Sequence, residues 1–153
     1  MAKGKFLTIV LAGAISCSPL ALAVDDYRVC PAEQTQIGLE TVKDACGTIV
    51  KPDFEIDETT SLSDLAGLKD ERDAFRQEVR DFGTCITQFI NSYRRPGADA
   101  SSTAPDKAAC AHSWAEDQAT ESIREFGRSC LQFNDMALIK GEPSMQGACY
   151  PQF

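Results

Sequence analysis

The stretch 65-LAGLKDERDAFRQEVRDFGTCITQFINSY-93 carries the strongest structural signal in the chain. Its large residues recur at alternating spacings of three and four, which places them along one side of a helix. They are Leu65, Leu68, Arg72, Phe75, Val79, Phe82, Ile86, Phe89 and Tyr93, and only Arg72 interrupts the apolar stripe. Ser61 or Ser63 can cap the start, and Pro96-Gly97 ends the pattern. The sequence therefore predicts a helix over about 64–93, ~45 Å long at ~1.5 Å per residue.

A second amphipathic pattern follows a polar turn at residues 94–104. Thr103 or Ser102 can cap it, and Pro105 suits a first helical turn. Its stripe again has spacings of three or four and consists of Ala108, His112, Ala115, Ala119, Ile123, Phe126, Cys130 and Phe133. Two long amphipathic helices with a short connection pack antiparallel. The sequence therefore predicts an all-α fold, an antiparallel helical hairpin of about 64–93 and 105–134.

The flanking segments are shorter and less regular. A short N-terminal helix is expected between Cys30 and Gly47, with Leu39, Val42 and Cys46 on one face and Gly47 just past its end. Residues 48–60 lose the helical period, which predicts an extended connector or at most a short edge strand. After Phe133 one more apolar piece, 136–139, precedes Gly141 and Pro143, and a coil tail leads to Cys149.

The two long helices echo each other in sequence. Residues 78–83 and 122–127 share an apolar residue, Arg, an acid, Phe and then Gly, at Gly83 and Gly127. This is a duplication or two solutions to one packing problem. A glycine inside a helix costs about 1 kcal/mol relative to alanine. We expect close approach of the two helix backbones to explain both glycines.

The first 23 residues have the three parts of a secretory signal peptide. Lys3 and Lys5 form a basic start, residues 6–15 are mostly apolar, and Ala21-Leu22-Ala23 fits a cleavage site. The apolar run is shorter than the about 20 residues that span a bilayer. We expect cleavage after Ala23, with an uncleaved anchor or lipid attachment at Cys17 as alternatives.

Cleavage would leave a single disulfide-linked helical domain over 24–153, exported to the periplasm or secreted. The 153-residue sequence has 43% apolar residues and a mean hydropathy of -0.22, which excludes collagen-like, low-complexity and polytopic membrane classes. Its net charge of -8 becomes -10 when two lysines leave with the signal peptide. We therefore expect no nucleic-acid partner and no stable membrane span in the mature chain.

Six cysteines remain after cleavage, and an even number in an exported chain indicates three disulfides. They are Cys30, Cys46, Cys85, Cys110, Cys130 and Cys149. A hairpin that turns near residue 98 places Cys85 and Cys110 at the same level, so Cys85–Cys110 is the preferred bridge. Cys130 lies opposite residue 65, at the far end, and its partner is open. We favour Cys46–Cys130 with Cys30–Cys149.

Candidate chemistry is sparse. His112 is the only histidine, and Glu116 and Asp117 follow it at distances that suit metal ligation, yet its place opposite Gly83 favours a packing role. Trp114 lies off the stripe and either covers the edge of the core or contacts a partner. Acids at 53, 55, 57 and 64 have the spacing of a calcium loop but lack its sixth-position glycine. We assign no catalytic residue, metal or cofactor.

Two functions fit this composition. The first is a non-catalytic protein-interaction or structural module of the cell envelope or secretome, which binds a protein partner or a second copy. The second is a carrier of a small apolar ligand, in which a cavity is lined by Phe75, Phe82, Phe89, Phe126 and Phe133. We expect the first, because a mature chain of about 130 residues needs these aromatics for its core. An enzyme is a third possibility with no residues to carry it.

Overall fold

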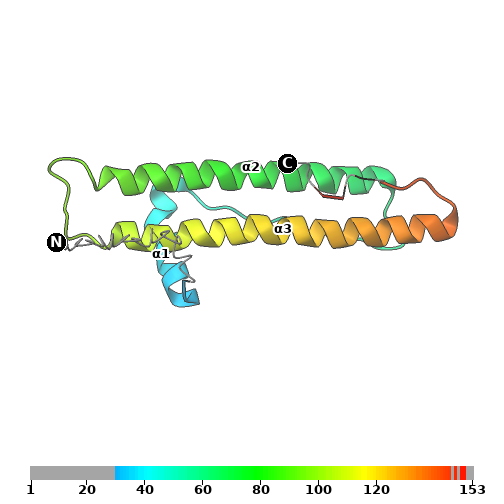
Figure 1. Ribbon diagram of the computed structural model, residues 1–153, viewed down its shortest axis with the longest axis horizontal. Coiled ribbons are helices and arrows are strands. Elements are labelled where there is room, and N and C mark those ends of the chain that lie inside the picture. Colours follow the sequence, from blue (N-terminus) through cyan, green and yellow to red (C-terminus); the bar gives the residue numbers. More distant parts are fainter. Residues whose placement is uncertain (1–29, 146, 148, 151–153) are drawn as a thin grey trace, which may run out of the picture.

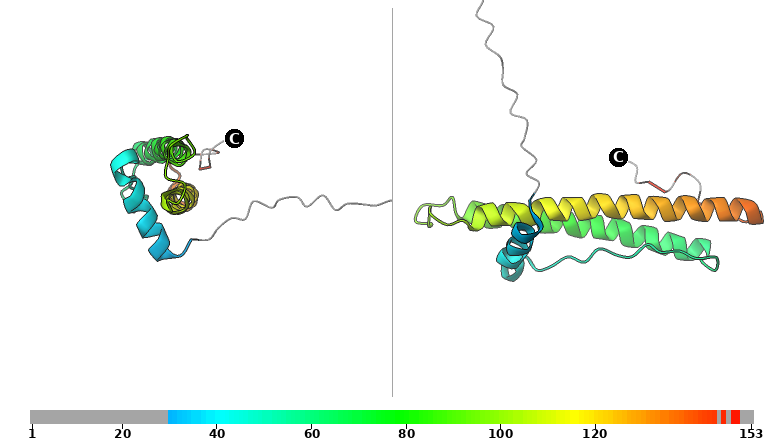
Figure 2. Two further views of the ribbon diagram at one scale, coloured as in Figure 1. Left: turned by 90° about the vertical axis from the view of Figure 1, so that its left-hand side faces the viewer. Right: turned by 90° about the horizontal axis from the view of Figure 1, so that it is seen from below.

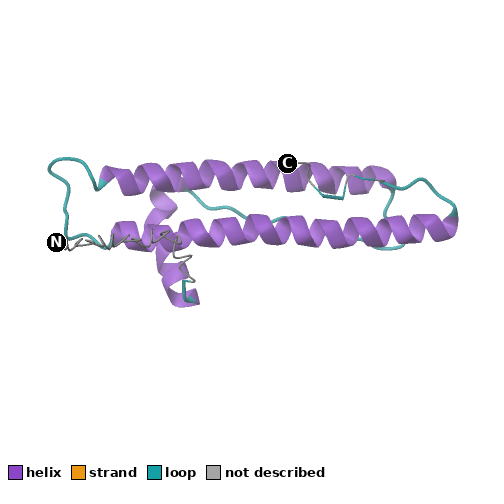
Figure 3. Ribbon diagram, viewed as in Figure 1, coloured by secondary structure: helices purple, strands orange, loops and turns teal. Residues whose placement is uncertain are grey.

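The computed structural model describes residues 30–145, 147, 149 and 150. The predicted signal peptide and Cys17 lie outside these residues. The described part of the chain is all-helical and holds three disulfides. Its helices are α1 (Ala32–Cys46), α2 (Leu62–Ser92) and α3 (Ala104–Lys140), coloured in sequence order in Figure 1 and by secondary structure in Figure 3. The predicted fold class is confirmed.

The long helices α2 and α3 lie side by side and antiparallel (Figure 1). Ser61 caps α2: its hydroxyl accepts from the Asp64 backbone N–H, and the Asp64 carboxylate accepts from the Ser61 N–H. Helix α3 extends six residues past the predicted end. Its apolar 136–139 piece continues the helix, and Gly141 ends it with a left-handed φ of 71°.

Helix α1 crosses the hairpin on one side, close to the end that carries the α2–α3 linker (Figures 1 and 2). Gly38 makes this crossing close, because a Cβ built there would overlap the carbonyl oxygen of Lys107 and lie 3.0 Å from the backbone nitrogen of Ala111. The close backbone approach therefore occurs between α1 and α3, at a glycine outside the repeated pattern.

The connector at 47–61 has no helix or strand and runs back along the hairpin from α1 to the start of α2 (Figure 2). It is anchored by Phe54, whose ring packs edge-on against Phe126 at 5.9 Å, and by a 2.5 Å hydrogen bond from the Ser129 hydroxyl to the Phe54 carbonyl. The predicted extended connector is confirmed.

Two hydrophobic clusters form the core. The first lies beneath α1 and contains Val42, Ile49, Phe75, Val79, Phe82, Ile86, Ala108, Ala111 and Ala115. The second lies towards the far end of the hairpin and contains Phe54, Leu65, Phe126, Cys130, Phe133, Ala137 and Cys149. The connector contributes one residue to each cluster, which ties it to both ends of the hairpin.

All six predicted cysteines are disulfide-bonded, but every predicted pairing is wrong. The bridges are Cys30–Cys110, Cys46–Cys85 and Cys130–Cys149. Each end of α1 is joined to a different long helix, so α1 works as a clamp across the hairpin.

The predicted pairings are wrong because residue numbers give the level of a cysteine along the hairpin but not the direction in which it points around its helix. Cys85 and Cys110 lie at one level along the hairpin, as predicted. They bond to Cys46 and Cys30, which lie at opposite ends of α1, a 15-residue helix ~22 Å long. Cys130 lies about 30 Å along the hairpin from the level of Cys85, which is too far for Cys46 to reach. It bonds instead to Cys149, 19 residues later in the chain.

Candidate functional site: a valley between the two long helices

An open groove and the C-terminal segment lie one after the other between α2 and α3, on the side away from α1, and we call this strip the valley. Its α3 wall follows one row of residues spaced by three or four: His112, Glu116, Ala119, Ile123, Gly127, Cys130 and Asn134. Its α2 wall follows Thr87, Gly83, Arg80, Arg76 and Arg72. One end view in Figure 2 shows α1 on one side of the paired helices and the C-terminal segment on the other.

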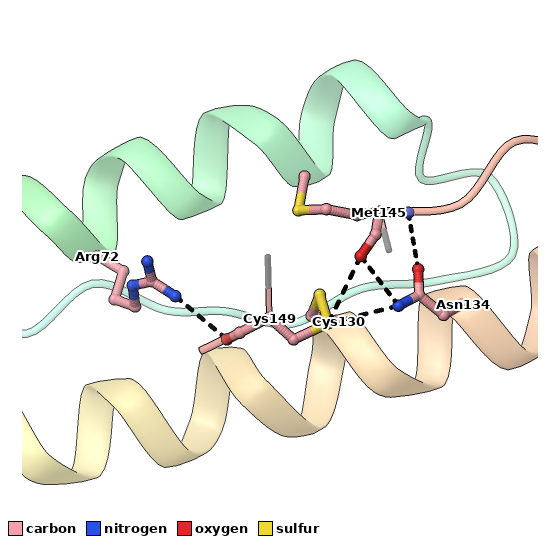
Figure 4. The surroundings of a disulfide bond; sticks show 5 residues. All are labelled: Arg72, Cys130, Asn134, Met145 and Cys149. Atoms are coloured by element: carbon pink, nitrogen blue, oxygen red, sulfur yellow. Dashed lines mark hydrogen bonds between the residues drawn. A yellow bond between two sulfur atoms is a disulfide. The ribbon is translucent and has the colours of Figure 1, made fainter. Parts of the chain in front are cut away.

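The described residues of the C-terminal segment, 142–145, 147, 149 and 150, lie along the far half of the valley. Figure 4 shows how its backbone is held. Asn134 exchanges two hydrogen bonds with Met145: its Oδ1 accepts from the Met145 N–H at 2.8 Å, and its Nδ2 donates to the Met145 carbonyl at 3.2 Å. Arg72 Nη1 donates to the carbonyl of Cys149 at 3.2 Å, and the Cys130–Cys149 bridge fixes the same residue covalently.

Arg72, the one charged residue in the predicted apolar stripe, is 1% exposed. Its guanidinium carbon lies 4.5 Å from the centre of the Phe126 ring, a cation–π contact, and Nε and Nη2 donate to Asp73 at 3.0 and 2.7 Å. The charge is therefore buried with a carboxylate, a ring face and a backbone carbonyl as partners. Arg72 couples the C-terminal segment to both helices.

Burial alone would raise the pKa of Asp73, but hydrogen bonds and charges from Arg72 and Lys69 hold the pKa below its ordinary value of 3.8. Lys69 Nζ donates to Asp73 at 3.2 Å from one turn earlier. The ionised carboxylate is thus the form that the folded protein stabilises.

Acidification should therefore weaken the fold through Asp73. A carboxyl whose folded pKa is lowered stabilises the protein above its unfolded pKa, and this contribution disappears as the pH falls through the folded pKa. We expect Asp73→Asn to lose less free energy of unfolding than the wild type between about pH 6 and pH 3, measured by urea denaturation. Asp57, Asp64 and Asp99 also have lowered pKa values, but they are present in both proteins. Equal losses in the two proteins would contradict the assignment.

The half of the valley nearer the linker is an open groove of about 690 Å³. Its floor is apolar and made mainly of small side chains, and its walls are polar. The lining residues are Arg76, Val79, Arg80, Gly83, Thr84, Thr87, His112, Ala115, Glu116, Asp117, Ala119, Thr120 and Ile123. The groove begins at Ile123, one helical turn from Gly127, the position beside which the ring of Tyr150 lies.

The two walls of the groove carry opposite charges. Arg76 and Arg80 lie on α2; Arg76 is 3.7 Å from Asp73, and Arg80 donates to the Gln77 side-chain oxygen at 2.6 and 3.1 Å. Glu116 lies on α3, 3.9 Å from Nδ1 of His112. The guanidinium groups on α2 can therefore donate hydrogen bonds to a bound molecule, and the Glu116 carboxylate on α3 can accept them.

His112 and Trp114 occupy different surroundings. The His112 ring covers Gly83, where an added Cβ would lie 2.8 Å from Nε2, so it packs opposite Gly83 as predicted and also lines the groove. Trp114 is half-buried against the first core cluster and does not line the groove. The described residues contain no group of three side chains placed to hold a metal ion.

Aromatic rings of other residues, and not a neighbouring helix backbone, occupy the space beside the two repeated glycines, Gly83 and Gly127. A Cβ on Gly127 would lie 2.6 Å from Cε1 of Tyr150, and Gly83 meets His112. The expectation of close backbone contact at these positions was wrong, because aromatic side chains from other segments occupy the space. The sequence does not predict the groove. Arg76 and Arg80 on its α2 wall lie beside the apolar stripe, and charged residues at such positions usually indicate only an exposed helix face. Arg72 within the stripe was the one available signal.

The chain was compared with protein-family models, with curated proteins and with solved structures, and no match was found in any of the three.

Proposed function

We propose that this protein is an exported, non-catalytic protein-interaction module of the periplasm or secretome, and that the open groove is its docking surface. The observation that carries the proposal is that one valley is filled by a peptide segment over its far half and open over the other half. A surface that already holds part of the chain through hydrogen bonds to its backbone has groups that can hold a segment of another protein.

The three disulfides support the proposal that the protein is exported. Three disulfides form and persist in oxidising compartments and are rare in reducing ones. None of the helices in the described ranges has the length and apolar composition that a membrane crossing requires.

The carrier hypothesis has less support. Phe75, Phe82, Phe126 and Phe133 are between 0% and 6% exposed and belong to the two core clusters, and Phe89 packs against the first of these clusters. These rings fill the core as packing residues, so a ligand between the helices would have to displace them.

Site-specific photo-crosslinking in the native host tests the proposal. A benzoylphenylalanine at Thr87 or Thr120, on opposite walls of the groove, should give a discrete adduct with another protein. The matched control is the same amino acid at Arg124, an exposed α3 position outside the groove, which should give none. The absence of adducts from both groove positions, or equal adducts from Arg124, would contradict the proposal. An adduct of twice the chain mass would identify a second copy as the partner.

A further inference from the structure

We propose that the α2–α3 linker, residues 93–103, is a cleavage site for proteases of the trypsin class, and that the product is a two-chain protein held together by a disulfide. The bond that is cut is the one between Arg94 and Arg95. This inference goes beyond the proposed function and does not depend on what the groove binds.

The basic residues of the chain single out this bond. Trypsin-class proteases cut after arginine or lysine, because a carboxylate in their specificity pocket binds the positive charge. Among the described residues, the basic residues outside the helices are Lys51, Arg94 and Arg95. Lys51 and Arg95 are each followed by proline, which resists cleavage because it has no N–H and its ring fixes the backbone. The bond after Arg94 therefore remains.

The linker around this bond is accessible. It loops beyond the ends of α2 and α3 (Figure 1), and the side chains of residues 94–97 are all exposed. Residues 93–103 form turns and bends and contain no helix or strand. Exposed loop tips with small and polar residues are the preferred sites of proteolytic nicking. The linker therefore offers the protease a segment that it can bind without unfolding a long helix.

The end of α2 offers little resistance to this binding. Its last turn contains no basic residue to offset the helix dipole. The Arg94 N–H donates to the Asn91 carbonyl at 3.1 Å, and the Arg94 guanidinium donates to the Asn91 side chain at 3.4 Å. Fraying of a terminal turn costs little free energy. Freeing Arg94 leaves the first core cluster in place, because the last fully buried residue of that cluster on α2 is Ile86.

The end of α3 is closed more firmly, although Lys140 lies in its last turn. The Glu142 N–H donates to the Ala137 carbonyl at 2.8 Å, which closes the helix end. The Lys140 ammonium donates to the Glu58 carbonyl at 3.1 Å, so the side chain that a protease would bind is already held. We therefore expect the bond after Lys140 to be cut later than the linker bond.

Hydrolysis changes the covalent structure in a defined way. The bond between the Arg94 carbonyl carbon and the Arg95 nitrogen breaks. Water supplies OH to the carbonyl carbon and H to the nitrogen, so the mass rises by that of one water. The linker is the only backbone connection between α2 and α3, so the disulfides then determine whether the two chains stay together.

The disulfides give a linked product. The first chain contains α1 and α2 with the bridge Cys46–Cys85, and the second contains α3 and the C-terminal segment with the third bridge. Of the three disulfides, Cys30–Cys110 is the one that joins the two chains. None of the residues that line the groove belongs to the linker, so we expect the groove to survive the cut.

Limited proteolysis of the oxidised protein with trypsin tests the proposal. Without reductant the product should be one species, heavier by one water. Reduction should release two fragments, one ending at Arg94 and one beginning at Arg95. An earlier cut at any other bond between residues 30 and 150 would overturn the proposal. Resistance of the linker under conditions that fully digest the reduced, unfolded chain would do the same.

Exposed linker variants locate the cut. Arg94→Gln should slow it at least tenfold, whereas the control Arg95→Gln removes the same charge one residue later and should stay within threefold. The double variant Arg94→Gln/Pro96→Ala should be cut again, now after Arg95, because the protecting proline is gone. An unchanged rate in Arg94→Gln, loss of the cut in Arg95→Gln, or resistance of the double variant would overturn the choice of bond.

The variant Cys30→Ser/Cys110→Ser tests the two-chain product. After the cut, wild-type fragments should stay joined in denaturant without reductant, and fragments of the variant should separate. Separation in the wild type, or joined fragments in the variant, would overturn the assigned product. The amide chemical shifts of Gly83 and Thr120 should stay the same when the wild type is cut. Large changes at these groove positions would contradict survival of the groove.

Discussion

Replacing Cys30 and Cys110 together with serine is expected to lower the free energy of unfolding by about 4 kcal/mol. Without that bridge the N-terminal end of α1 is released from α3, while Cys46 still joins its other end to α2. The relevant loop is shorter than the separation of 80 residues, because the Cys46–Cys85 bridge already shortens the path between the two positions to about 40 residues. Urea denaturation of the purified, fully oxidised variant measures the loss.

The matched variant Cys46→Ser/Cys85→Ser should lose nearly the same amount. Its bridge closes a separation of 39 residues, close to the shortened path for the other bridge. Both variants should contain no free thiol, since each substitution removes a complete pair. Two free thiols in Cys30→Ser/Cys110→Ser would show that Cys30 and Cys110 are bonded to other cysteines and not to each other.

A non-reducing tryptic map provides an independent check of the pairing. The positions of lysine and arginine place each of the six cysteines in a different tryptic peptide, so every bridge joins a distinct pair of peptides. We expect the peptide with Cys30 to be linked to that with Cys110, and the peptide with Cys46 to that with Cys85. Any other pairing of these four peptides would contradict the clamp.

Local periodicity predicted the helices well because it depends on neighbours along the chain. The stripe from Leu65 to Tyr93 and the Ser61 cap lie within single segments, and the structure confirms both. The end of α3 was placed too early because residues 134–140 carry fewer large apolar side chains on the buried face. Their helix is nevertheless continuous to Lys140.

The disulfides and the groove depend on a different kind of information. The level of Cys85 along the hairpin follows from residue numbers, but the direction in which it points depends on how α2 is rotated and on where α1 crosses. Neither quantity has a local sequence signal. The same holds for the C-terminal segment: nothing near Asn134 or Tyr150 in the sequence indicates that the chain returns along the valley.

A single added methyl group, in the substitution Gly38→Ala, tests whether α1 packs closely on α3. Gly38→Ala is expected to destabilise the protein by about 3 kcal/mol, because the added Cβ would overlap the backbone carbonyl oxygen of Lys107, which no side-chain rotation can move. Helix α1 would have to lift away from α3, and the two disulfides at its ends limit how far it can move.

The control for this substitution is Gly67→Ala, the same chemical change in α2. A Cβ at Gly67 would have no atom within 4 Å, so alanine should stabilise the protein by about 1 kcal/mol through its higher helix propensity. Urea denaturation of the two oxidised variants should thus give changes of opposite sign. If Gly38→Ala is as stable as Gly67→Ala, α1 does not pack closely on α3. In that case the crossing helix would be held by its disulfides alone, and the first core cluster would lose the cover that α1 provides.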